Sequence, residues 1–214
     1  MSLTGIFLIT FLPVHLAGNF LLLAGDGGEA FNIYADFMTS NPLIKFISYG
    51  LYFFILLHTV LGLVLWSKNR KAATGRSRYA VNTTKATATN AGIAKNMAAI
   101  GTIILVFIVI HMYQFWFKMK IGDVAMATYD GVEVKNLFEL VEATFTDFTF
   151  VMFYVACMAV IGLHLKHGFS SAFQSLGLNH KKYTPFIQLL GTAYSVLIPL
   201  GFAIIPLAFY LLYS

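Results

Sequence analysis

Residues 148–173 read FTFVMFYVACMAVIGLHLKHGFSSAF, and this stretch decides the fold class. Its first 18 residues contain no Asp, Glu, Lys or Arg. A helix that is apolar on every side belongs in lipid or deep inside a protein. About 20 such residues cross the hydrocarbon core of a bilayer. We therefore predict a transmembrane helix over residues 148–173.

Four other stretches have the same character. The whole chain is 58% hydrophobic and only 11% charged, whereas soluble domains carry about 25% charged residues. We predict an all-α integral membrane protein in which residues 1–214 form a single domain. The first apolar run lacks a basic n-region and a small-residue cleavage site, so we expect it to be a span rather than a cleaved signal peptide. The other four predicted spans are 3–24, 43–66, 97–117 and 186–213.

The charges of the connections predict the orientation. The connection from Lys68 to Lys95 holds seven Lys and Arg and no acid, and the connection from Lys166 to Lys182 holds three Lys and no acid. All nine acids fall in the two remaining connections or beside them. Basic connections face the cytoplasm. We therefore expect a cytoplasmic N-terminus and a periplasmic C-terminus.

Each of the first four predicted spans carries a histidine at membrane depth, namely His15, His58, His111 and His164. Ionisable groups at membrane depth are rare and usually functional. At 1.5 Å per residue, His15 and His111 lie in the outer half of the bilayer, and His58 and His164 lie in the inner half. The sequence thus predicts two layers about 10 Å apart, each with one histidine from each of two helices.

Two facing imidazoles suit the two axial positions of a haem b. A protein zinc site needs three or four ligands together, and non-haem iron prefers carboxylates, which the spans lack. An interhelical hydrogen bond between histidines remains an alternative. A histidine proton relay in a transporter is another.

Small residues follow three of the histidines at helical spacing. Gly18, Gly62 and Gly168 share the histidine face of their helices, and we expect them to let a porphyrin edge approach the backbone. Close helix packing explains each glycine taken singly. His167, one turn beyond His164, could compete with it as ligand, but we expect His167 to lie beside a headgroup or a haem propionate.

The chain resembles a known family at several of these positions. The matching segments are Leu3-Thr4-Gly5, His15-Leu16-Ala17-Gly18-Asn19, His58, Phe107-Ile108-Val109-Ile110-His111, and His164-Leu165-Lys166-His167-Gly168-Phe169-Ser170-Ser171-Ala172-Phe173-Gln174. Their order over nearly the whole chain resembles the dihaem cytochrome b (b558-type) membrane anchor of succinate dehydrogenase and fumarate reductase. That family folds as a five-helix bundle that holds two haems b.

The resemblance implies the roles of the histidines. His15 and His111 would bind the iron of the distal haem, and His58 and His164 the iron of the proximal haem. Electrons would pass between a cytoplasmic iron–sulfur subunit and menaquinone. FAD and the iron–sulfur clusters would belong to partner subunits, in the bacterial inner membrane, and complexes of this type can dimerise.

The chain also departs from the family. Members usually have a short basic segment before the first span, which this sequence lacks. Gly162 stands where one fumarate reductase of this type has a proton-carrying glutamate. Glu29 and Asp36 are the nearest candidates for a quinone-site carboxylate.

Two further assignments stay open at this point. Arg76, Arg78 and Lys95 are candidate partners of the inner haem propionates. The cytochrome b subunit of a formate dehydrogenase or hydrogenase is an alternative identity, since those proteins also use intramembrane histidines.

Overall fold

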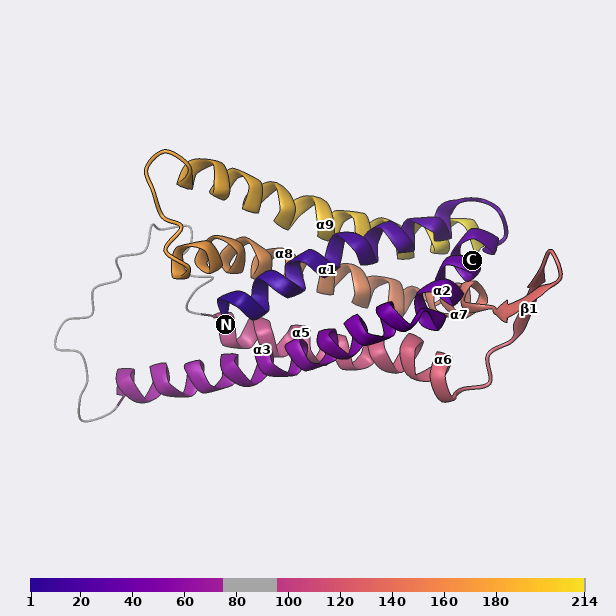
Figure 1. The fold of residues 1–214 in the computed structure, drawn as a ribbon, viewed down its shortest axis with the longest axis horizontal. Helices are drawn as coiled ribbons and strands as arrows, with labels where there is room; N and C mark the ends of the chain where they lie inside the picture. The colour runs from indigo at the N-terminus through magenta and orange to yellow at the C-terminus, as the bar shows by residue number, and fades with distance from the viewer. Residues whose placement is uncertain (75–95, 214) are drawn as a thin grey trace.

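A computed structural model describes residues 1–74 and 96–213. Within those ranges the chain has five helices that are long and apolar enough to cross a membrane. They lie side by side in an elongated bundle (Figure 1). The predicted all-α class and the five spans are confirmed. The five helical stretches are Ser2–Leu23, Pro42–Lys71, Met97–Ile121, Phe148–Ser175 and Thr184–Tyr213.

The elements of the described ranges follow one another along the chain. In order they are α1 (Ser2–Phe20), the 3₁₀ turn η1 (Leu21–Leu23), α2 (Glu29–Ser40), α3 (Pro42–Thr74), α5 (Met97–His111), the π-helical segment η2 (Met112–Phe117), α6 (Lys118–Ile121), β1 (Met126–Tyr129), β2 (Val132–Lys135), α7 (Leu137–Phe145), α8 (Phe148–Ser175) and α9 (Thr184–Tyr213). Helix α3 continues well past Trp66, where the sequence predicts that its span ends.

Helix α8 is the centre of the bundle and packs against α9, α5 and α1. Its pairing with α9 is close because small residues stand between the two backbones. A side chain at Gly162 would begin 2.9 Å from the carbonyl oxygen of Ser195, and one at Gly191 would begin 2.7 Å from the Phe169 ring. The absence of a glutamate at position 162 therefore has a packing reason.

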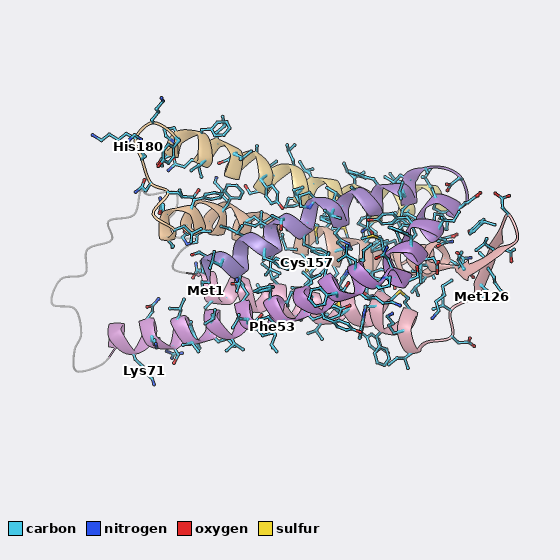
Figure 2. The ribbon with its side chains drawn as sticks, in the orientation of Figure 1. Met1, Phe53, Lys71, Met126, Cys157 and His180 are labelled. Atoms are coloured by element: carbon cyan, nitrogen blue, oxygen red, sulfur yellow. The ribbon has the colours of Figure 1, made fainter. Side chains whose placement is uncertain are left out.

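Helix α3 lies at the edge of the bundle. None of the residues in its most apolar stretch is buried, and large apolar side chains such as Phe46 and Phe53 are exposed. Phe53 lies midway along this helix (Figure 2). An apolar face of this kind is what a lipid-exposed helix presents, because lipid tails are as apolar as the side chains.

One end of the bundle carries a cap that the sequence analysis does not predict. It consists of α2, the antiparallel hairpin β1–β2 and α7. The strands are joined through Asp130 and Gly131, which both have positive φ, as a tight two-residue hairpin turn requires. Asn32 of α2 is fully buried. Its amide donates to Tyr129 Oη and Asn136 Oδ1 and accepts from Phe138 N–H, so it joins all three parts of the cap.

The two ends of the bundle differ in charge. The N-terminus and the connection between α8 and α9 lie at one end, and the C-terminus lies at the other end with the cap (Figure 1). The acidic residues all lie in or beside the segments that form the cap end. At the opposite end the described residues contribute basic side chains, which are Lys68, Arg70, Lys71, Lys166, Lys181 and Lys182.

Candidate functional site

The first histidine pair joins α1 to the end of α5. The rings of His15 and His111 lie with their centres 5.9 Å apart and their planes at 81°. Each histidine projects from its helix toward the other across the interior of the bundle. The pairing inferred from depth therefore matches the contact in the structure.

The second pair joins α3 to α8. The ring centres of His58 and His164 are 6.3 Å apart and their planes meet at 73°. This pair again takes one histidine from each of two helices, as the sequence predicts. All four rings are half-buried.

The spacing of each pair can be compared with that of two imidazoles on one metal ion. A metal–imidazole nitrogen bond is about 2.0 Å. The nitrogen lies about 1.1 Å from the centre of a five-membered ring with bonds near 1.35 Å. Two imidazoles on opposite sides of a metal therefore have ring centres about 6.3 Å apart. Both observed spacings, 5.9 and 6.3 Å, fit this arrangement.

The two layers are farther apart than the depth argument predicts. Thr4 of α1 contacts His58, and His15 follows eleven residues later on the same helix. Tyr154 of α8 contacts His111, and His164 follows ten residues later. At 1.5 Å per residue both helices give a separation of about 15 Å along their axes. The estimate of about 10 Å is too short because it counts from the predicted ends of separate spans and not along one helix.

Aromatic rings enclose the first pair. Phe11 stacks on His15 with ring centres 5.1 Å apart, and Phe202 lies 5.4 Å from the same ring. Phe107 and Phe115 flank His111 at 5.7 and 5.2 Å. These rings come from α1, α9, α5 and η2, so the pair has an apolar wall suited to a flat hydrophobic ligand.

Polar partners differ among the four histidines. Thr4 Oγ1 lies 3.0 Å from His58 Nδ1, and Tyr154 Oη lies 3.5 Å from His111 Nδ1. Asn19 Nδ2 lies 3.3 Å from His15 Nδ1. His164 Nδ1 is buried and has no hydrogen-bond partner among the described residues. An unpartnered buried nitrogen is rare in folded proteins.

The predicted glycines have different surroundings. A side chain at Gly18 would begin 2.4 Å from the Tyr34 ring, so this glycine gives room to α2. A side chain at Gly62 would begin 3.6 Å from the Met1 methyl group, and nothing lies within 4 Å of a side chain at Gly168. A side chain at Gly5, in the Leu3-Thr4-Gly5 segment, would begin 3.5 Å from His58 Cε1. Of the three predicted positions, Gly168 has the most space beside it.

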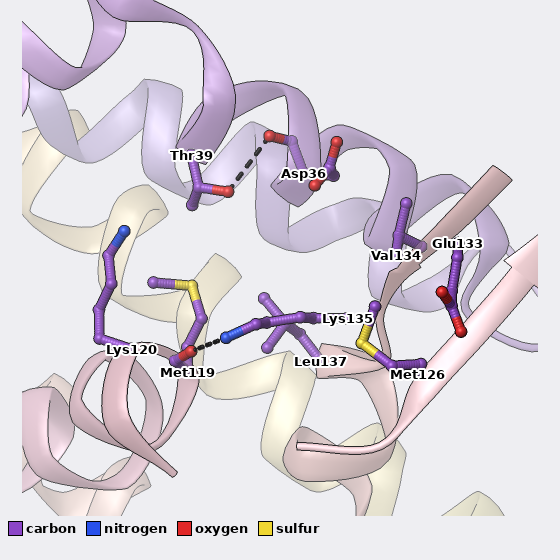
Figure 3. A pocket seen from close by; sticks show the side chains of 9 residues that line it. All are labelled: Asp36, Thr39, Met119, Lys120, Met126, Glu133, Val134, Lys135 and Leu137. Carbon is purple, nitrogen blue, oxygen red and sulfur yellow. Dashed lines mark hydrogen bonds between the residues drawn. The ribbon is translucent and has the colours of Figure 1, made fainter. Parts of the chain in front are cut away.

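The two carboxylates considered for a quinone lie on α2 in the cap. Asp36 lines an open cleft of about 230 Å³ between α2, α6 and the hairpin. Lys120, Lys135 and Glu133 also line it, and Lys135 donates to the Met119 carbonyl (Figure 3). Glu29 stands in the first turn of α2 and is not part of the cleft lining. Arg76, Arg78 and Lys95 lie outside the described residues.

Sequence reasoning missed the hydroxyls beside the histidines. The sequence could have pointed to Thr4, because it stands eleven residues before His15 and so shares the same helical face. It could not have pointed to Tyr154, because Tyr154 stands ten residues before His164 and so lies on a different face of α8. The described residues contain no group of three or more His, Cys, Asp or Glu that could hold a metal ion. The candidate ligands therefore occur only as pairs.

Comparison with known proteins identifies no relative of this chain. No family model matches it, and no curated protein or solved structure shows a significant similarity to it.

Proposed function

We propose that this chain is the dihaem cytochrome b anchor of a succinate:quinone oxidoreductase. One observation carries the proposal: two pairs of imidazoles face each other at 5.9 and 6.3 Å, each pair drawn from two membrane-spanning helices. The resemblance in histidine order, described above, adds the succinate dehydrogenase or fumarate reductase context. The proposed location is the bacterial inner membrane.

The four histidines would supply the axial nitrogens of two haems b. His15 and His111 would hold the distal haem, and His58 and His164 the proximal one. The haems would supply one-electron transfer between an iron–sulfur subunit and menaquinone. The chain itself orients the rings, excludes water with the aromatic wall of the first pair, and spans the bilayer.

The difference in charge between the two ends of the bundle supports a cytoplasmic location for the partner subunits. We place the end that carries Lys181 and Lys182 in the cytoplasm, because basic connections remain inside. The iron–sulfur and FAD-bearing subunits would dock there. Menaquinone would bind nearer the cap, where Asp36 and Glu29 are the candidate carboxylates. A C-terminal alkaline phosphatase fusion should be active in this orientation, and an active N-terminal fusion would contradict it.

Variants of the histidines test the ligand assignment. His58→Ala and His164→Ala should each remove one haem per chain, and His15→Ala and His111→Ala should each remove the other. His167→Ala is the matched control, since it is one turn from His164 and should leave both haems in place. Haem content per chain in purified membranes measures the outcome. Retention of both haems in His58→Ala or His164→Ala would contradict the assignment.

The partner that copurifies distinguishes the alternative. Covalent FAD and iron–sulfur clusters in the isolated complex support the succinate:quinone oxidoreductase. A formate dehydrogenase or hydrogenase partner would assign the same dihaem chain to that class instead. A proton transporter would contain no haem at all.

A further inference from the structure

In each histidine pair, one ring has a hydroxyl group beside its Nδ1 atom. Thr4 Oγ1 lies 3.0 Å from His58 Nδ1, and Tyr154 Oη lies 3.5 Å from His111 Nδ1. The two hydroxyls come from different helices and lie in different layers. The recurrence suggests that the same physical requirement acts on both pairs.

The direction of the Thr4 hydrogen bond follows from its second partner. Thr4 Oγ1 donates its only proton to the Met1 carbonyl at 2.7 Å. A hydroxyl has one proton and two acceptor lone pairs, so toward His58 it can only accept. The proton of the neutral His58 ring is therefore on Nδ1, and its lone pair is on Nε2. Thr4 is buried, so water does not replace this contact.

Tyr154 repeats the arrangement in the other layer. Its hydroxyl donates to Gln114 Oε1 at 2.6 Å, which leaves its oxygen as an acceptor toward His111 Nδ1. Gln114 is buried and lies in the π-helical segment η2 that directly follows His111. The neutral His111 ring then carries its proton on Nδ1 and its lone pair on Nε2.

The other member of each pair lacks such an acceptor. His164 Nδ1 has no hydrogen-bond partner among the described residues. Asn19 turns its amide nitrogen toward His15 Nδ1 and also donates to the His15 carbonyl at 2.7 Å. A nitrogen donor at Nδ1 does not favour a proton there. Each pair thus contains one ring with a hydroxyl acceptor at Nδ1 and one ring without such an acceptor.

We infer that Thr4 and Tyr154 are positioning residues that hold His58 and His111 in the tautomer whose Nε2 lone pair is available to a metal. The inference rests on the proposed function, because it concerns the haem ligands. A partner on the far nitrogen of a ligating histidine fixes the ring orientation and raises its basicity. Each hydroxyl should therefore act on one haem and leave the other unchanged.

The effect of removing a hydroxyl has a predictable sign. A less basic imidazole stabilises the ferric state less, so the midpoint potential of that haem should rise. The affinity for haem at that site should fall by about 10-fold, as is typical for the loss of an outer partner of a metal ligand. Thr4→Val should change only the haem of His58 and His164. Tyr154→Phe should change only the haem of His15 and His111.

The test is a redox titration of each haem in the purified complex, together with haem content and the low-spin electron paramagnetic resonance signal. Thr4→Ser keeps the hydroxyl and should restore the wild-type potential. Thr10→Val is the matched control for Thr4→Val, since Thr10 lies on the same helix and bonds only the Phe7 carbonyl. Tyr194→Phe is the control for Tyr154→Phe, since Tyr194 donates to the Ile9 carbonyl.

The outcomes separate this inference from the proposed function. A wild-type protein without haem would overturn both. A wild-type protein with two haems whose potentials are unchanged in Thr4→Val and Tyr154→Phe would overturn the inference alone. An equal shift of both haems in either variant would indicate a general structural effect and would also overturn it. Thr4→Val and Tyr154→Phe concern different histidine pairs. If one variant protein fails to assemble, the potential measured in the other still tests the inference.

Discussion

Gly27 and Gly28 share a left-handed backbone, with φ of 70° and 91°, but differ in what surrounds them. Nothing lies within 4 Å of a side chain at Gly27. A side chain at Gly28 would begin 2.3 Å from Phe138 Cγ and 2.4 Å from its Cβ. The start of α2 therefore packs closely against α7 at Gly28, and Gly27 is the natural reference for the backbone effect alone.

Gly28→Ala should consequently destabilise the chain more than Gly27→Ala. Both lose about 1–2 kcal/mol from left-handed strain, and Gly28→Ala should lose about 1–3 kcal/mol more from overpacking. For a chain of this length each kcal/mol corresponds to about 2–4 °C in Tm. Thermal unfolding in detergent measures the difference. Equal melting temperatures for the two variants would contradict the contact between Gly28 and Phe138.

Asp26 gives the cap a dependence on pH. The N–H groups of Ala30 and Gly28 donate to its carboxylate, and these bonds lower the pKa of Asp26 from its ordinary value of 3.8. A group with a depressed folded-state pKa stabilises the protein fully above 3.8, and this stabilisation is lost as the pH falls through the lower folded-state value.

The stabilisation by Asp26 should appear as a pH-dependent difference from Asp26→Ala. The wild type should melt at a higher temperature than Asp26→Ala near pH 6. The difference should shrink as the pH falls below 3.8, because the protonated carboxyl no longer accepts both bonds as a charge. Melting temperatures measured between pH 6 and pH 3 test this. A difference that stays constant over that range would be inconsistent with the bonds to Ala30 and Gly28.

The sequence predicts a candidate site residue where the residue type itself is unusual for its place, as a histidine is within an apolar span. The four histidines and their pairing followed from counting residues along straight helices. Tyr154 could not be assigned, because its contact with His111 depends on how two helices are rotated against each other. Gly18 shows the same limit, since its neighbour is the Tyr34 ring of another element.

At the scale of elements, the long spans were predictable and the cap was not. A window of about 20 apolar residues detects a span regardless of its surroundings. Helices α2 and α7 have 12 and 9 residues, and their helicity depends on packing against other parts of the cap rather than on length. Asn32 supplies much of that packing through three hydrogen bonds to the hairpin and α7.

Asn32→Leu should loosen the cap while leaving the spans intact. The substitution removes the acceptor of the Phe138 N–H, and an unsatisfied buried group costs about 1–3 kcal/mol. Limited proteolysis should then cut within residues 126–135 faster than in the wild type. Thr39→Val on the same helix is the control, since Thr39 bonds only carbonyls of α2. Cleavage at the wild-type rate in Asn32→Leu would show that Asn32 does not hold the cap together.

At the scale of the whole molecule, five helices bring four histidines into two layers about 15 Å apart along the helix axes. Neither layer belongs to one helix, so the pairs exist only when the bundle is assembled. Opposite charges at the two ends give the bundle a direction in the membrane. Together these features give a bundle long enough to cross a membrane, with a basic end and an acidic cap at the other end.

The most direct test of haem binding by this chain is the reduced-minus-oxidised absorption spectrum of the purified protein, with haem quantified per polypeptide. We predict a b-type spectrum and two haems per chain, because each histidine pair offers one pair of axial ligands. A purified, folded chain without a b-type spectrum would contradict the central claim.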